Sequence, residues 1–203
     1  MNKLALRTHF KALLNRSDIT DALADTFIDM GITRIQRNLR VPFMEKQATY
    51  PISAATASIT LPGDFLEIID IIYGGHSLDR LTMREMQLHL KTAQAGSPHY
   101  FTRQGGSFLL HPTPSSGTVA LNYYASSPDM IIDTDESTLA KVASDLIIYA
   151  SLAYSADYYI DERAALFEGK YSQFLSEITE QAIDAESVGT VQAIRPHVYL
   201  DME

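Results

Sequence analysis

The chain has 203 residues, 46% of them hydrophobic, which is enough for one good core or one core with a small appended unit. Its 16 basic and 25 acidic residues give a formal charge of −9, which argues against a protein that grips nucleic acid, because such binding depends on neutralising phosphates. Disulfides are excluded, because there is no cysteine. The longest uncharged helical run, between Asp145 and Asp157, is far shorter than the ~20 apolar residues of a membrane span. Arg7 and Lys11 interrupt the start, which does not resemble a signal peptide.

Two helices are predicted at the start of the chain. The first spans residues 4–15 and is amphipathic. Ser17 or Asp18 can cap the second, which should run to about Leu39, before Pro42 ends it. The side chains expected to face inward from the second helix are Leu23, Phe27, Met30 and Ile35.

Turn residues divide the next stretch into strands. Pro62-Gly63-Asp64 ends a strand at Leu61, and an isoleucine-rich run over residues 67–73 stops at Gly74-Gly75. A short helix over residues 83–90 is predicted next, because Thr82 and Glu85 have the spacing of a capping box and Leu81 and Met86 that of a hydrophobic staple.

A hairpin and a returning strand complete this β-unit. Residues 99–103 and 107–111 flank Gly105-Gly106, a pair that tolerates the positive φ angles of a tight hairpin. A turn over residues 112–117 then leads to a strand over residues 118–125. Alternation predicts that one face of this strand carries Val119, Leu121 and Tyr123.

Two long helices are predicted after the strands. The first carries one apolar stripe, and Asp161 can cap the second, whose stripe runs from Ala164 to Ala182. Helices joined by so short a loop should pack antiparallel, against the N-terminal helices. The residues of the first stripe are Leu139, Val142, Leu146, Tyr149, Ala153, Ala156 and Ile160.

The predicted fold is therefore α+β, an antiparallel helical bundle with a small inserted antiparallel β-unit and an extended C-terminal tail. We assign residues 1–46 and 129–187 to the bundle and residues 47–128 to the β-unit with its one short helix. Residues 188–203 form the C-terminal arm.

The C-terminal arm carries apolar side chains although it has no core of its own to join. A terminal segment without a partner is usually polar and frayed, so this composition favours docking on a neighbouring molecule, as an added strand or an extended arm, over folding back. The residues expected to bind the partner are Ile194, Arg195, Pro196, Val198, Tyr199 and Leu200.

Five further residues are secondary interface candidates. Arg34, Arg37 and Arg40 cluster at a helix end, where they could bind a phosphate or a carboxylate of a partner. Cations at that position also stabilise the helix itself by about 0.3–1 kcal/mol, which is the simpler interpretation. Tyr124 and Tyr158 each belong to a tyrosine pair, and aromatic side chains often anchor contacts between subunits.

Signatures of catalysis and metal binding are absent from the sequence. No HExxH, GxSxG, GxxxxGK[ST] or GxGxxG pattern is present. His99 and His111 could pair across neighbouring strands, and Asp133, Asp135 and Glu136 could supply oxygen ligands to a metal. The simpler interpretation of the two histidines is a cross-strand contact on a solvated face. The simpler interpretation of the three acidic residues is a set of solvated charges at a helix N-terminus. We therefore expect no enzyme, no cofactor and no metal.

The order of these segments resembles the head-to-tail adaptor (connector) proteins of short-tailed bacteriophages. The segments that carry the resemblance are, in order, LPGDFLEI, a Gly-Gly break, a short helix, SPHYFTRQGG, SFLLHPTP, TVALNYYA and two helices. The helical stretch over residues 17–50 and the helix containing DERAALFEGKYSQFL also lie where that family has similar segments. The resemblance thus covers residues 1–187.

This resemblance implies a structural protein of the virion neck that assembles in the host cytoplasm. It implies a dodecameric ring of identical copies beneath the portal protein, which continues the DNA channel toward a downstream tail or nozzle protein. DNA would pass without specific binding, which suits the acidic excess, and no membrane is involved. Two alternatives stay open: a small α+β enzyme or ligand-binding domain that uses His99 and His111, and a tail-completion (terminator) protein.

Overall fold

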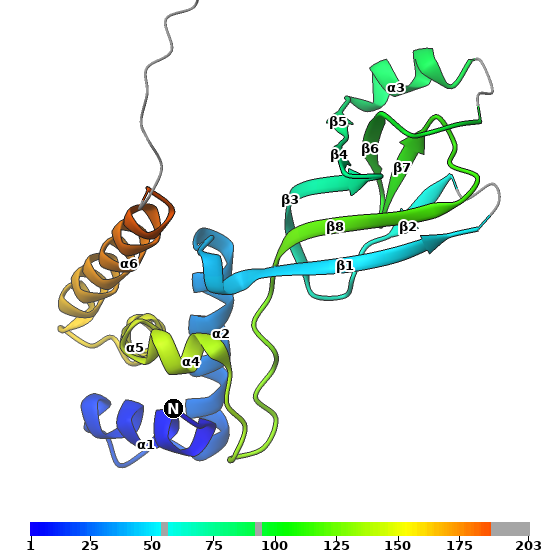
Figure 1. Cartoon of the computed structure of the whole chain (residues 1–203). Helices are drawn as coiled ribbons and strands as arrows, with labels where there is room; N and C mark the ends of the chain where they lie inside the picture. Colours follow the sequence, from blue (N-terminus) through cyan, green and yellow to red (C-terminus); the bar gives the residue numbers. More distant parts are fainter. Residues whose placement is uncertain (54–56, 92–94, 188–203) are drawn as a thin grey trace, which may run out of the picture.

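The computed structural model describes residues 1–53, 57–91 and 95–187, and Figure 1 shows them as a helical lobe and a β lobe. The predicted C-terminal arm, with all six of its expected contact residues, lies outside the described residues. The helices are α1 (Lys3–Leu14), α2 (Asp21–Asn38), α3 (Met83–His89), α4 (Thr138–Val142), α5 (Ser144–Tyr159) and α6 (Ala164–Ser187), with a 3-10 turn at Pro42–Met44. The predicted α+β class is confirmed.

Two four-stranded sheets form the β lobe. Their strands are β1 (Glu45–Ile52), β2 (Ser58–Thr60), β3 (Phe65–Tyr73), β4 (His76–Ser77), β5 (Asp79–Arg80), β6 (Tyr100–Gln104), β7 (Ser107–His111) and β8 (Gly117–Ala125). One sheet has the order β1-β8-β3-β4 and the other β2-β7-β6-β5, with β5 and β6 the parallel pair. β1 was not among the predicted strands; it is polar and lies at a sheet edge, where Pro51 is tolerated.

The predicted hairpin, capping box and returning strand of the β lobe are confirmed, but the β-unit is not wholly antiparallel as predicted, because β5 and β6 pair in parallel. The predicted hairpin is β6–β7, and Gly105 in its turn has φ 58°. In α3, the Thr82 side chain accepts a hydrogen bond from Glu85 N while the Glu85 carboxylate accepts one from Thr82 N. The core lies between the two sheets and includes the predicted face of β8, because its members come from both: Ile59, Ile71, Phe101, Phe108, Leu110, Val119, Leu121 and Tyr123.

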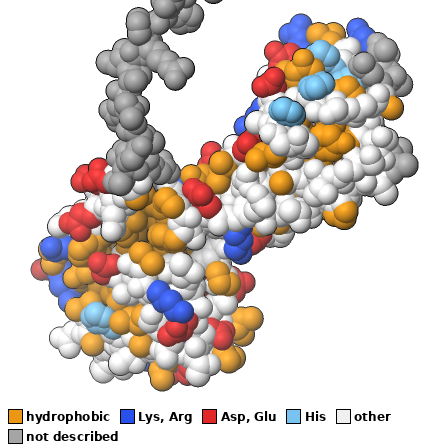
Figure 2. Space-filling model, in the orientation of Figure 1, with side chains coloured by type: hydrophobic (Ala, Val, Ile, Leu, Met, Phe, Trp, Pro, Cys, Tyr) orange, Lys and Arg blue, Asp and Glu red, His pale blue; other side chains and the backbone are white. Residues whose placement is uncertain are grey.

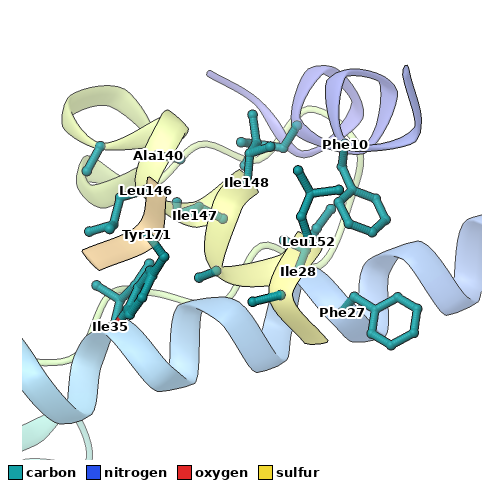
Figure 3. Close-up of a cluster of buried hydrophobic side chains, with 14 of the residues drawn as sticks. Phe10, Phe27, Ile28, Ile35, Ala140, Leu146, Ile147, Ile148, Leu152 and Tyr171 are labelled. Carbon is teal, nitrogen blue, oxygen red and sulfur yellow. The ribbon is translucent and has the colours of Figure 1, made fainter. Parts of the chain in front are cut away.

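The centre of the helical lobe is α5, whose residues 146–156 are buried or half-buried on every side rather than along one stripe (Figure 3). The predicted stripe begins correctly at the buried Leu139 but is wrong at Val142 and Ile160, which are 54% and 92% exposed. Helical geometry is interrupted at Ala143, which separates α4 from α5. Ile160 adopts a left-handed φ of 54° just after the end of α5. By contrast, the stripe predicted for α6 faces the core, with Phe167 and Tyr171 buried.

The crossing of α2 and α5 brings two backbones close together. A Cβ built on Gly31 would lie 2.6 Å from Ser151 Oγ, 3.0 Å from Ser151 N and 3.2 Å from Ile147 O. Met30, predicted to face inward, is 40% exposed, because its neighbour Gly31 occupies the crossing. In Figure 1, α2 stands upright while α5 is seen nearly end-on, so these two helices cross, which differs from the antiparallel arrangement predicted for the bundle as a whole. The antiparallel pair was predicted for α5 with α6, and these helices pack against each other through the rings of Tyr149, Phe167 and Phe174.

α2 begins later than predicted. Its N-cap is Thr20, whose side chain accepts a hydrogen bond from Leu23 N, and neither Ser17 nor Asp18 takes that position. The reason is that Ile19 is buried in the helical core, so the chain stays extended past it before the helix starts.

Arg163 ties α1 to the turn before α6. Its guanidinium donates to the carbonyls of Leu14, at 2.9 Å, and Leu13, at 3.4 Å, near the C-terminal end of α1. The Asp161 carboxylate accepts hydrogen bonds from Arg163 Nε at 3.0 Å and from its backbone N at 2.9 Å. These hydrogen bonds lower the pKa of Asp161 to about 2.

We expect the variant Asp161→Asn to weaken the dependence of stability on acid pH. Because the pKa of Asp161 in the folded chain lies below its ordinary value of about 3.9, the charged pair stabilises the fold above ~pH 4 and loses this effect as the pH falls toward 2. Urea unfolding from pH 5 to pH 2 should show a shallower slope for the variant. Glu162→Gln, at the exposed neighbouring position, is the control and should keep the original slope; equal slopes in all three proteins would contradict the assignment.

Candidate interaction surfaces

The predicted arginine cluster is largely engaged within the chain. Arg34 forms an ion pair with Glu168 and lies 4.0 Å from the ring centre of Tyr171. Arg40 donates from Nε to Glu67 at 2.8 Å, which joins the two lobes, and from Nη1 to the Leu39 carbonyl at the end of α2. Arg37 is exposed and makes no ion pair with another described residue. Of the three, Arg37 is therefore the side chain available to a partner.

The two candidate tyrosines differ in position. Tyr158 is 63% exposed at the end of α5, with its ring 5.7 Å from that of Phe27 and 4.9 Å from that of Tyr159. Tyr124 is half-buried in β8 and packs against the helical core. Tyr158 can therefore contact another molecule, whereas Tyr124 contributes to the junction of the lobes.

The histidines do not form the pair that a catalytic site would need. His99 N donates to the His111 carbonyl at 3.0 Å, but the ring next to His111 is that of His89, at 5.8 Å. His111 is buried, not on a solvated face, and burial together with His89 lowers its pKa. Within residues 1–53, 57–91 and 95–187, no group of three or more histidine or acidic side chains could hold a metal ion.

The loop between β8 and α4 exposes two large apolar side chains. Ile131 is 78% exposed and Ile132 is 60% exposed. The Asp135 carboxylate fixes their backbone, because its Oδ2 accepts hydrogen bonds from Ile131 N at 2.7 Å and Ile132 N at 2.9 Å. Lys3 Nζ donates to the Ile131 carbonyl at 3.3 Å. We call Ile131 and Ile132 the isoleucine knob, whose backbone is held in place while its side chains face solvent.

The other acidic residues of this loop also have partners within the chain. Asp133 accepts a hydrogen bond from Arg7 at 2.8 Å. The same guanidinium donates two hydrogen bonds to the Asp25 carboxylate, at 2.6 and 2.8 Å. Glu136 pairs with Lys141 at 3.1 Å. These carboxylates therefore form neither the metal site nor the solvated helix charges considered from the sequence. Their ion pairs connect the knob loop to α1, α2 and α4.

An open apolar groove lies beside the C-terminal end of α6, where Figure 2 shows hydrophobic side chains gathered on the helical lobe. Its volume is ≈ 260 Å³, below the range of about 300–1,000 Å³ of small-molecule pockets, so it suits protein side chains better than a cofactor. Gln181 is a polar member of the lining. We call it the α6 groove; its apolar lining includes Val41, Phe43, Val142, Ile178, Ala182 and Ala185.

Sequence reasoning missed both surfaces. A readable signal existed for the knob, since Met130-Ile131-Ile132 is an apolar run between Asp129 and Asp133 in a segment with no helix or strand pattern. No comparable signal existed for the α6 groove, because its walls come from three separate parts of the chain.

Comparison with known proteins gives a family match along nearly the whole chain. Residues 1–195 match the model of the family described as SU10 adaptor protein. No curated protein matches the chain. Among the described helices, none has the length and apolarity to cross a membrane. The resemblance seen in the sequence is thus confirmed, and the chain belongs to the SU10 adaptor protein family, with the role of a phage head-tail adaptor.

Proposed function

We propose that this adaptor forms a homo-oligomeric ring, dodecameric in the virion, that joins the portal protein to a downstream tail or nozzle protein and continues the DNA channel. The observation that carries the proposal is the family match over residues 1–195, because an adaptor must bind portal or tail components. A ring is the usual closed assembly of identical copies joined by two different surfaces. The family is structural, which favours this role over an enzyme that uses His99 and His111.

We assign the portal contact to the C-terminal arm, with Ile194, Val198, Tyr199 and Leu200 as its apolar anchors. Two facts support the assignment. The family match continues to residue 195, beyond the end of α6 at Ser187. Among the described residues, the last one packed against the helical core is Ala182, near the end of α6. Arg37 and Tyr158, the exposed secondary candidates, would supplement this contact.

We assign the channel wall to the acidic face of α6. Glu177, Glu180 and Asp184 are exposed and, at spacings of three and four residues, share one face of the helix. A wall of carboxylates repels phosphates, so DNA can slide along it without being held. The formal charge of −9 for the whole chain agrees with this role.

Mature particles provide the test of the proposed function. Quantitative mass spectrometry of purified virions should find about a dozen copies of the chain per particle, and electron microscopy should place them as one ring between portal and tail. A chain that is absent from virions, or that occupies the far end of the tail, would overturn the proposal in favour of an assembly factor or a terminator.

Charge reversal tests the channel wall separately. The native protein should show no measurable affinity for free duplex DNA at physiological salt, whereas Glu177→Lys with Glu180→Lys should bind it with an affinity that falls steeply as salt rises. The matched control is Glu162→Lys with Asp79→Lys, which makes the same change of charge at exposed positions away from that face and should bind more weakly. Fluorescence anisotropy measures both. Tight DNA binding by the native protein would contradict the role of the acidic face.

A further inference from the structure

The isoleucine knob and the α6 groove are both apolar and lie toward opposite ends of α2. The knob is joined to the early part of α2 through Asp133, Arg7 and Asp25, while the groove includes Val41, just beyond the end of the helix. The rise of 1.5 Å per residue puts roughly 20 Å of helix between Asp25 and the end of α2 at Asn38. One convex and one concave apolar surface therefore occupy distant parts of one subunit.

We propose that the isoleucine knob of one copy docks in the α6 groove of the next copy, and that this contact closes the ring. The inference rests on the proposed function, which it deepens by naming the surfaces between subunits. Because the two surfaces differ and lie far apart, their contact is head-to-tail, the type that repeats into rings or filaments rather than stopping at a symmetric dimer.

The knob has the properties of an interface anchor. Large apolar side chains exposed side by side mark interaction sites, and a backbone already fixed by Asp135 and Lys3 loses little freedom on binding. A loop that served only to connect β8 with α4 would not need Ile131 and Ile132 in solvent. The groove is apolar and open, and its volume lies below the usual range of small-molecule pockets.

Charge favours a second copy as the occupant and also orients it. The knob is flanked by two acidic side chains: Asp133, which is paired with Arg7, and Asp129, which is exposed and makes no ion pair with another described residue. At the groove, Lys141 directly precedes Val142 but is paired with Glu136, whereas Arg37, four residues before Val41 in the chain, is exposed and has no such partner among the described residues. On α6, Glu180 and Asp184 directly precede the lining residues Gln181 and Ala185. The knob therefore fits with Asp129 toward Arg37 and away from α6.

The absence of cysteine from the chain allows a direct crosslinking test. The double variant Ile132→Cys, Ala185→Cys should form a ladder of disulfide-linked multimers on mild oxidation, both in concentrated protein and after assembly on portal rings. A mixture of the two single variants should stop at dimers, because each copy then has one competent surface. In the control Ile132→Cys, Leu166→Cys, the second cysteine is exposed on α6 outside the groove lining, and no ladder should form.

Each other outcome overturns the proposal in a recognisable way. Dimers of Ile132→Cys alone would mean that two knobs meet symmetrically. A ladder that appears only after removal of residues 188–203 would mean that the chain's own arm fills the groove. If rings assemble on portals but no crosslink forms, the knob does not dock in the groove, while the proposed function is unaffected. If the protein never binds portals, the proposed function itself is refuted.

Charge substitution gives an independent measurement. Ile131→Asp with Ile132→Asp should abolish ring formation in sedimentation analysis while the thermal midpoint stays unchanged, because both side chains are already in solvent. Leu88→Asp with Leu90→Asp, at exposed apolar positions of the β lobe, is the matched control and should still form rings. Rings of the native size from the knob variant would refute the proposal.

Discussion

Gly31→Ala is expected to destabilise the protein by about 2 kcal/mol or more, although alanine is the better helix former by about 1 kcal/mol. The reason is the crossing of α2 and α5, where the new Cβ would lie 2.6 Å from Ser151 Oγ and 3.0 Å from Ser151 N. The second atom belongs to the backbone and cannot rotate away, so the helices must separate and the packing around α5 must loosen. Chemical and thermal unfolding measure the loss, with roughly 2–4 °C in Tm for each kcal/mol.

Two further variants identify the crossing as the cause. Gly169 lies in α6 with no atom within 4 Å of a built Cβ, so Gly169→Ala should stabilise the protein by up to about 1 kcal/mol. Adding Ser151→Ala to Gly31→Ala should recover part of the loss, because it removes the nearest contact but leaves the backbone contacts with Ser151 N and Ile147 O. If both glycine variants gained stability equally, close packing at the crossing would be disproved.

The β lobe was predictable strand by strand because its signals are local. Pro62-Gly63-Asp64 and Gly105-Gly106 mark turns by residue type, and the capping box of Thr82 and Glu85 marks a helix start. The pairing of strands was not predictable in this way. β1 pairs with β8, which places Glu45 opposite Tyr124, and no local pattern encodes a contact between residues so far apart.

The helical lobe shows where periodicity fails. α5 carries apolar or small residues on every face, including Ile147, Ile148 and Leu152, so several stripes fit the sequence equally well. Which residues are buried is then decided by the helices that surround α5, a tertiary property. Met30 illustrates the same point: its hydrophobicity suggested an inward position, but the space next to α5 admits only Gly31.

Most of the proposed interaction surface could not be inferred from sequence for a related reason. The walls of the α6 groove meet only after Val41, Val142 and Ala182 are brought together by folding. The arginine cluster was visible, but its sequence did not reveal that Arg34 and Arg40 bind carboxylates of the same chain, which leaves Arg37 exposed. The residue type shows what a side chain could bind, but only the packing of the folded chain decides whether that side chain is free to bind a partner.

Removal of residues 190–203 is expected to abolish assembly onto portals while the thermal midpoint of the free protein stays nearly unchanged. Among the described residues, the last one packed against the helical core is Ala182, and we expect the free subunit to fold without the arm. In the portal complex, burial of Ile194, Val198, Tyr199 and Leu200 would contribute about 1.5–3 kcal/mol each before the cost of ordering the arm is subtracted.

The truncation separates three possibilities when differential scanning calorimetry is combined with a portal-binding assay. A variant that unfolds markedly earlier would show that the arm packs on its own subunit. A stable variant that still binds portals would move the contact elsewhere, with Arg37 at the end of α2 as the next residue to change. The full-length variant Ile194→Ser, Tyr199→Ser is the matched control for chain length; loss of binding there too would assign the effect to the apolar side chains, since these are the only groups removed.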